Sequence, residues 1–347
     1  MEALVKFGSN NGDVEVRQIA EPDDPKPNQV LLEVQAAGVC GSDLHMWREH
    51  HSWKIKLPLV LGHEFCGVVA AVGQDVTRFK PGDRVVCETA ASVCGECVYC
   101  LSGNYNLCSK RLGYGALTDG AFTRYVTARP QILHLIPPNV PFKHAALTEP
   151  ICVAYNALVE KTPVIKPGDK VVIQGPGPIG IMAIAIAKAA GARKVIITDV
   201  NPWRLELARK LGPTRAVDVS KEDLHQVQQE LGMTEGFDVA LEMSGNARAL
   251  DQILDNMACG GRIALLGIIP GKAAIDWNKV IFRGLHIKGI YGREMYETWY
   301  KMIALLQSHV DITPAITHRL PAREFRRGFE AMLSGQSGKV VLDWTQL

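Results

Sequence analysis

Short runs in which apolar and polar residues alternate, separated by turn residues, dominate the first 150 positions. The clearest runs cover residues 30–34, 66–73 and 82–86. Such alternation is typical of strands that bury one face, and the Gly and Pro residues between the runs indicate turns. The pattern therefore predicts an antiparallel, barrel-like unit that is rich in β-structure.

From about Pro167 the pattern changes to apolar strands that alternate with helices. A strand at 170–174 precedes an apolar helix at 179–190 and a second strand at 194–199, and further strands are expected at 239–242, 262–266 and 286–289. This alternation predicts an α/β fold with a doubly wound parallel sheet. A helix near 296–306 and a strand at 339–342 do not continue it, and we expect this tail to rejoin the first unit.

Length and composition favour two globular domains. A chain of 347 residues exceeds what one hydrophobic core usually organises. The formal net charge is +2 and no basic stripe is present, so no nucleic-acid partner is expected. The most apolar stretch is interrupted by Lys188 and is too short to span a bilayer, and the N-terminus lacks a secretory pattern. We therefore expect a cytoplasmic protein without membrane segments.

A glycine-rich turn follows the first strand of the parallel sheet. Residues 175–180 read G-P-G-P-I-G and open the apolar helix. Glycines there let the turn close and let a pyrophosphate approach the backbone, while the free N–H groups at the helix N-terminus attract the phosphates. We predict a dinucleotide site that includes Gly175, Gly177, Ile179 and Gly180. The alternative is a glycine-rich turn without a ligand.

An acidic residue at the end of the next strand sets the expected cofactor. Asp199 can accept hydrogen bonds from the adenosine ribose, and its charge would repel a 2′-phosphate, which favours NAD over NADP. Arg204 could receive such a phosphate, but beside Asp199 it is better placed to cover the adenine or to pair locally. Ligands of open α/β sheets bind where strands end, although a glycine at a strand end without a ligand gives the same sequence pattern. The later strand ends add the candidate cofactor residues Leu266, Gly267, Ile268, Ile290 and Tyr291.

Four of the nine cysteines lie between positions 94 and 108, which indicates thiolates kept for a metal rather than disulfides. Cys94, Cys97, Cys100 and Cys108 have the spacing C-x2-C-x2-C-x7-C. Four thiolates this close in sequence can surround one tetrahedral zinc and leave no position for substrate, so the predicted role is structural. An iron–sulfur cluster and a set of reduced surface cysteines are the alternatives.

A second set of metal-ligating residue types is dispersed along the chain. Cys40, His63 and either Glu64 or Glu149 supply S, N and O ligands for a catalytic zinc, which also needs one position open to substrate. Taken singly, a cysteine in a strand or a Gly-His-Glu turn is more often structural. Their combination ahead of a dinucleotide fold indicates a catalytic zinc site.

These motifs, in this order, resemble the zinc-containing medium-chain dehydrogenases over essentially the whole chain. The C-terminal third, including residues 242–245, 290–302 and 334–340, most closely resembles the threonine dehydrogenase branch. The resemblance implies a GroES-like catalytic domain at 1–150 and 294–347, with a structural zinc lobe at about 88–112. It further implies an inserted Rossmann domain at 151–293, two zinc ions per chain and a homotetramer.

The resemblance also implies roles for the dispersed set. Cys40, His63 and Glu64 would hold the catalytic zinc, and Glu149 would exchange with Glu64 or bind water held by the metal. The implied reaction is oxidation of a secondary alcohol, L-threonine to 2-amino-3-ketobutyrate, with hydride transfer to NAD. The proton relay to solvent would use Ser42 and His45.

Three departures from the threonine dehydrogenases bear on the substrate. Ser42 stands where a threonine is usual, residues 153–156 replace Asn-Ala-Val-His, and residues 47–51 replace an aromatic and acidic loop. The last two are more similar to the polyol-dehydrogenase branch. A polyol or another secondary alcohol is therefore an alternative substrate. A non-catalytic NAD-binding protein is the alternative from a different functional class.

Overall fold

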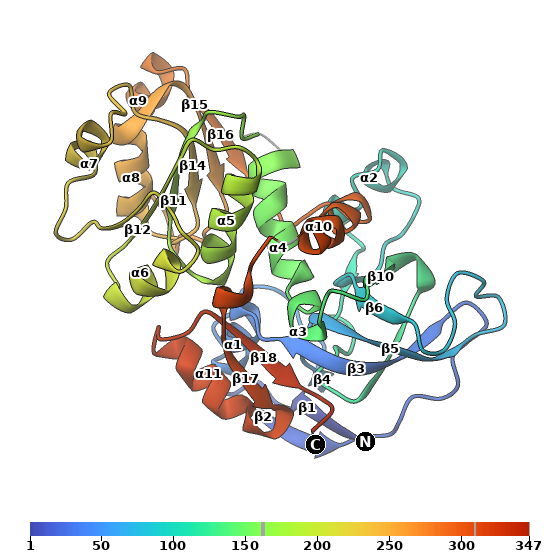
Figure 1. The fold of residues 1–347 in the computed structure, drawn as a ribbon. Coiled ribbons are helices and arrows are strands. Elements are labelled where there is room, and N and C mark those ends of the chain that lie inside the picture. Colours follow the sequence, from blue (N-terminus) through green and yellow to red (C-terminus); the bar gives the residue numbers. More distant parts are fainter. Residues whose placement is uncertain (161–163, 309, 347) are drawn as a thin grey trace. The chain divides into compact units, whose positions relative to one another are not determined.

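The structure, a computed structural model, describes residues 1–160, 164–308 and 310–346, which divide into two units (Figure 1). Unit 1 consists of Met1–Glu149, Glu294–His309 and Ile316–Leu347. Unit 2 consists of Pro150–Arg293 and Val310–Ala315. Both ends of the chain thus contribute to unit 1. No helix in the described ranges combines the length and apolar character that crossing a membrane requires.

The main sheet of unit 1 has seven strands in the order β10-β6-β5-β3-β18-β17, with β9 also paired to β3. The predicted alternation is visible in β3, where Val30, Leu32 and Val34 point into the core. The tail strand β18 pairs antiparallel with β3, as its place outside the α/β alternation predicts. The strands are β3 (Val30–Gly38), β5 (Glu64–Val72), β6 (Arg84–Cys87), β9 (Tyr125–Ala128), β10 (Leu133–Leu135), β17 (Ile316–Pro321) and β18 (Lys339–Asp343).

Smaller elements complete unit 1. A three-stranded sheet has the order β2-β1-β4, and β7 and β8 form a separate pair that frames the predicted zinc lobe. These strands are β1 (Glu2–Lys6), β2 (Val14–Gln18), β4 (Leu59–Val60), β7 (Ala90–Ser92) and β8 (Leu112–Gly113). The helices are α1 (Gly41–Trp47), α2 (Val98–Leu101), α3 (Phe142–Ala145), α10 (Glu297–Gln307) and α11 (Phe325–Leu333). Helix α4 (Thr148–Tyr155) follows α3 and leads into unit 2.

Unit 2 contains a six-stranded parallel sheet in the order β13-β12-β11-β14-β15-β16. Its order reverses at β11, where the predicted glycine-rich turn follows the strand. The strands are β11 (Lys170–Gln174), β12 (Lys194–Asp199), β13 (Arg215–Asp218), β14 (Phe237–Glu242), β15 (Met257–Leu265) and β16 (His286–Gly289). The helices are α5 (Pro178–Ala189), α6 (Pro202–Arg209), α7 (Leu224–Glu230), α8 (Ala247–Asn256) and α9 (Trp277–Phe282).

Four strand starts differ from the sequence prediction. Strand β6 begins at Arg84 rather than Gly82, and β14 begins at Phe237 rather than Val239. Strand β5 begins at Glu64 rather than Cys66, so the residues of the Gly-His-Glu turn lead directly into the sheet. Strand β15 begins at Met257 rather than Arg262. Gly260 and Gly261 lie inside β15, although glycine is uncommon within strands. A register shift between Phe237 and Val239 of β14 accommodates this early part of β15.

Candidate metal centres and coenzyme site

Cys40 occupies the N-cap of α1, immediately after β3 ends. The side chain of Asp43 accepts a hydrogen bond from the backbone N–H of Cys40, at 2.9 Å. Asp43 is fully buried, and its second oxygen lies 4.0 Å from Nδ1 of His63. At this distance Asp43 acts on His63 through its charge rather than through a hydrogen bond. A role for Asp43 was not predicted from the sequence, although an acidic residue three positions after a helix N-cap is a recognised capping signal.

His63 and Glu64 approach Cys40 from the start of β5. Gly62 precedes them with φ +92°, and this left-handed turn directs the chain into the strand. The ligand atoms of Cys40, His63 and Glu64 all lie within 4.8 Å of one another. A sulfur, a nitrogen and an oxygen so placed fit three positions of a tetrahedral zinc and leave the fourth for substrate or water.

The electrostatics around His63 favour a cation. Burial by itself would lower the pKa of His63, but the hydrogen bond and charge of Cys40, together with Asp43 and Glu149, raise it to about 10. Burial also raises the pKa of the carboxyl group of Glu64. Several acidic groups thus surround one partly buried imidazole, as expected of a site whose charge balance includes a metal ion.

Lys339 supplies a second cation to this centre. Its ammonium group makes an ion pair with Oε2 of Glu64, and both side chains are at most 2% exposed. Lys339 is the first residue of β18, so the returning tail of the chain brings it beside β5. Lys339 and Glu64 are 275 residues apart in sequence, so their pairing could not be predicted from the sequence. Lys339 was predicted only as part of a strand.

Glu149 lies in the first turn of α4 and is almost fully buried. Its charge helps to raise the pKa of both His63 and Glu64. It does not belong to the group of three ligand atoms that lie within 4.8 Å of one another among the described residues. The structure therefore places Glu64, rather than Glu149, with Cys40 and His63.

Ser42 and His45 lie on the same face of α1, three residues apart. The hydroxyl oxygen of Ser42 is buried and has no hydrogen-bond partner among the described residues. His45 is exposed, and its ring meets that of Trp53 edge to face at 6.2 Å between centroids. A buried hydroxyl and an exposed imidazole one turn apart can connect an interior group to solvent.

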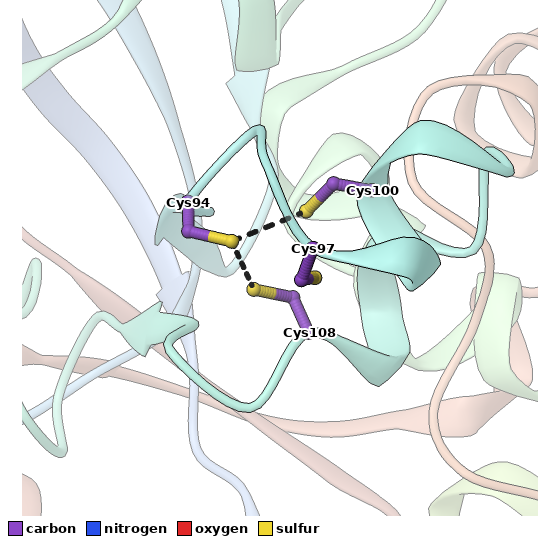
Figure 2. Close-up of side chains that lie close together, drawn as sticks. All are labelled: Cys94, Cys97, Cys100 and Cys108. Atoms are coloured by element: carbon purple, nitrogen blue, oxygen red, sulfur yellow. Dashed lines mark hydrogen bonds between the residues drawn. The ribbon is translucent and has the colours of Figure 1, made fainter.

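The four cysteines of the predicted lobe converge (Figure 2). The sulfur of Cys94 lies 3.9 Å from that of Cys100 and 3.6 Å from that of Cys108. Ligands of a tetrahedral zinc with Zn–S bonds of about 2.3 Å stand about 3.8 Å apart. All four sulfurs lie within 4.8 Å of one another, which suits one ion better than a larger iron–sulfur cluster.

The protonation of these thiols differs before any metal binds. Hydrogen bonds from the backbone N–H groups of Glu96 and Cys97 lower the pKa of Cys94 to about 6. Burial raises the pKa of Cys100 to about 12. At neutral pH the lobe thus offers a ready thiolate in Cys94, and a bound cation would favour ionisation of the others. All nine cysteines are free thiols.

The glycine-rich turn has the predicted strand–turn–helix context. Strand β11 ends at Gln174, and α5 begins at Pro178 with Gly177 as its N-cap. A Cβ on Gly180 would lie 2.1 Å from the carbonyl oxygen of Gly175, so any larger residue would push the helix away from the turn. This close approach exposes the N-terminus of α5 to a phosphate.

A cavity of about 590 Å³ adjoins the carboxyl ends of the strands in unit 2. Gly175 and Asp199 line it, together with Ser220, Ser244 and Arg248. The side chain of Asp199 accepts hydrogen bonds from the backbone N–H groups of the next two residues, at 2.8 and 2.7 Å, which fix its orientation. Arg248 was missed in the sequence, although it follows the end of β14 and lies in the first turn of α8.

The other predicted coenzyme residues do not line this cavity. Arg204 lies in the first turn of α6, and its buried Nε has no hydrogen-bond partner among the described residues. Residues 266–268 follow the carboxyl end of β15, and residues 290–291 follow that of β16, as predicted. The residues that do not line the cavity are Gly177, Ile179, Gly180, Arg204, Leu266, Gly267, Ile268, Ile290 and Tyr291.

Comparisons with known proteins identify the relatives of this chain. Residues 26–138 match the alcohol dehydrogenase GroES-like domain, and residues 178–308 match the zinc-binding dehydrogenase model. The chain is 49% identical to L-threonine 3-dehydrogenase of Anaeromyxobacter sp. over 346 residues, which cover 99% of both chains. It belongs to the zinc-binding alcohol dehydrogenase family. The predicted resemblance is confirmed.

Solved structures of other family members share the fold. The 2R,3R-butanediol dehydrogenase of Bacillus subtilis superposes with a TM-score of 0.90 at 28% identity and 99% coverage of both chains. Galactitol-1-phosphate dehydrogenase of Escherichia coli gives 0.89 at 26% identity, with 99% of this chain and 100% of the other covered. The predicted combination of a GroES-like domain and a Rossmann-type parallel sheet is confirmed.

Membership of the zinc-binding alcohol dehydrogenase family settles the reaction class. The protein is a zinc-dependent, NAD-linked dehydrogenase that acts on an alcohol, so the prediction of an enzyme is confirmed and the non-catalytic alternative is wrong. The four-cysteine set and the Cys40, His63 and Glu64 set are consistent with two zinc ions per chain.

Proposed function

We propose that the protein oxidises L-threonine to 2-amino-3-ketobutyrate with NAD. The observation that carries this proposal is full-length identity of 49% to L-threonine 3-dehydrogenase in a chain that keeps the Cys40, His63 and Glu64 arrangement. Residues 1–150 and 294–347 would form the catalytic domain and residues 151–293 the coenzyme domain. The cysteine lobe at about 88–112 would hold the structural zinc.

Each residue of the catalytic set has a proposed role. Cys40, His63 and Glu64 would hold zinc, with the charge of Asp43 acting on His63 and the ion pair with Lys339 orienting Glu64. When bound, zinc polarises the substrate hydroxyl and NAD accepts the hydride. Glu149 exchanges with Glu64 or orients water at the open position.

The proton of the substrate hydroxyl leaves along helix α1. Ser42 receives it at the buried Oγ, which has no other hydrogen-bond partner among the described residues. His45 lies one turn further along the same face and is exposed, so it can release the proton to water.

Loss of the relay should reduce turnover without removing the metal. We expect His45→Asn to keep both zinc ions and NAD affinity while lowering turnover by roughly 10²-fold, with the largest loss at low pH, where proton release is hardest. Ser42→Ala should act in the same pathway, so the double variant should be little worse than the poorer single one. Steady-state rates across pH for the three variants check this, and additive losses would show that the two residues act separately.

The coenzyme site should select NAD through Asp199. The gap between NAD and NADP in kcat/KM should narrow in Asp199→Gly, because the substitution removes the charge that repels a 2′-phosphate. Arg248, which lines the same cavity, would remain available to that phosphate. The measurement is kcat/KM with each coenzyme. Equal values for the two coenzymes in the unmodified enzyme would contradict this role of Asp199.

A polyol or another secondary alcohol is the second candidate substrate. The structural likeness to 2R,3R-butanediol dehydrogenase and the departures at residues 47–51 and 153–156 favour it. NADH production across L-threonine, L-serine, sorbitol, xylitol and 2,3-butanediol distinguishes the two. We expect the highest kcat/KM with L-threonine, whereas preference for a polyol would transfer the assignment to the second candidate.

We also propose that the enzyme is a cytoplasmic homotetramer. The nine free thiols suit a reducing compartment. Strand β16 lies at the edge of the parallel sheet, and Ile281 and Phe282 of the preceding helix α9 are 68% and 84% exposed. An open edge beside apolar side chains supports pairing with a second copy. Light scattering of the purified protein measures the number of subunits.

A further inference from the structure

Glu242 is a fully buried carboxylate at the end of β14, in the middle of the parallel sheet of unit 2. Its Oε1 accepts hydrogen bonds from the backbone N–H groups of Ser244 and Gly245, at 2.9 and 3.0 Å, and from the hydroxyl of Ser244. The N–H of Gly245 also lies 3.3 Å from Oε2. The side chain thereby organises the loop that follows its own strand.

The same residue also holds the loop that follows β15. The carbonyl oxygen of Glu242 accepts hydrogen bonds from the N–H groups of Leu266 and Gly267, at 3.0 and 2.9 Å. A Cβ on Gly267 would lie 2.4 Å from Oε2 of Glu242 and 2.3 Å from the nitrogen of Gly245. Only glycine permits this approach, so the two loops pack directly against each other across the carboxylate.

The glycine-rich turn after β11 joins this assembly. A Cβ on Gly175 would lie 2.9 Å from Cα of Ser244, which places the turn against the loop that Glu242 organises. Ser244 and Gly175 both line the cavity of about 590 Å³. The neighbouring ends of β11, β14 and β15 therefore meet around Glu242, whose carboxylate holds the loop after β14 and whose backbone carbonyl oxygen holds the loop after β15.

We propose that Glu242 is a positioning residue for NAD, holding the loops after β14 and β15 in the geometry that receives the coenzyme. The inference rests on the proposed coenzyme site. Hydrogen bonds to a charged acceptor are stronger and shorter than those to a neutral one, and a carboxylate accepts at both oxygens. This suits a position where several N–H and O–H donors converge.

An amide at position 242 would disturb the two loops unequally. A glutamine can keep one oxygen on Ser244 and Gly245, but its NH₂ group must then replace Oε2. That group carries two hydrogens and cannot accept from the N–H of Gly245, and it would stand where Oε2 already lies so close to Gly267 that a Cβ there would be 2.4 Å away. The loop after β15 should move more than the loop after β14. The loop after β14 is the one that lines the cavity beside Asp199.

Two ligands separate these effects in the zinc-loaded enzyme. Calorimetry with Glu242→Gln should show NAD binding about tenfold more weakly. AMP, which is expected to occupy only the cavity beside Asp199, should bind no more than about threefold more weakly. Gly267→Ala disturbs the same contact from the loop after β15, and it should also weaken the binding of NAD more than the binding of AMP. This second variant keeps the test informative if Glu242→Gln fails to fold.

Gln228→Ala serves as the matched control. The buried side-chain amide of Gln228 donates to the carbonyl oxygen of Asn256, just before β15 begins and far along the strand from Glu242. Its loss should lower the melting temperature and leave both affinities unchanged. Unchanged NAD affinity in folded Glu242→Gln, or equal losses for NAD and AMP, would overturn the inference. Failure of the unmodified enzyme to bind NAD would contradict the proposed function instead.

Discussion

Replacing Cys40 by alanine should remove one of two zinc ions per chain and lower kcat/KM by at least about 10³-fold. Cys40 provides the only sulfur in a ligand group whose other members are His63 and Glu64. Without it, the remaining imidazole and carboxylate are a poor zinc site, and the polarisation of the substrate hydroxyl is lost. The variant should still fold, because the hydrogen bond from the backbone N–H of residue 40 to Asp43 does not involve the sulfur.

Cys66→Ala is the matched control for this variant. Cys66 is a buried cysteine of unit 1, in β5, but its sulfur contacts backbone carbonyl oxygens and is absent from both groups of potential metal ligands among the described residues. The control should keep two zinc ions and most of its activity. Elemental analysis and steady-state kinetics provide the comparison. Full activity of Cys40→Ala with a single zinc would show that the metal centre is elsewhere.

Replacing Cys97 by alanine should have the opposite profile, a large loss of stability with little direct effect on chemistry. The lobe between β7 and β8 has a short helix, α2, whose Val98 and Leu101 are 70% and 76% exposed. With so little apolar surface buried, the lobe depends on its metal, and we expect the melting temperature to fall by on the order of 10 °C with loss of one zinc.

The control for the lobe is Cys259→Ala. Cys259 is an exposed cysteine in unit 2, and its substitution removes a thiol without touching either metal set. Calorimetric melting and zinc content should both match those of the unmodified enzyme. If Cys97→Ala retained two zinc ions and an unchanged melting temperature, the structural role of the four cysteines would be wrong.

The sequence was most informative where chemistry depends on local spacing. The four cysteines lie within 15 positions, and the glycine-rich turn joins a strand directly to a helix, so their geometry follows from short segments. The strand at 170–174 is reproduced without change, because its central residues Val171, Val172 and Ile173 form the continuous apolar run that is typical of a strand buried on both faces. Helix α6 was missed despite Asn201 as N-cap and Pro202 at the first helical position, which are recognised start signals.

The sequence was least informative where residues from distant strands meet. Nothing near Glu64 indicates that Lys339 will neutralise it, because the pairing depends on β18 lying beside β3 in the same sheet as β5. Glu242 was visible only as part of a motif, and its contacts with Gly267 require the folded order of β14 and β15. The ligands could thus be predicted as residue types, whereas the groups that orient them could not.

The most direct test of this account is NADH formation from L-threonine by enzyme that holds two, one or no zinc ions per chain. Zinc should be removed first from the Cys40, His63 and Glu64 centre, which has an open position, and later from the closed four-cysteine set. We expect full activity with two zinc ions, almost none with only the four-cysteine zinc, and recovery when one equivalent is restored. Undiminished oxidation of L-threonine by the zinc-free protein, or none by the two-zinc enzyme, would contradict it.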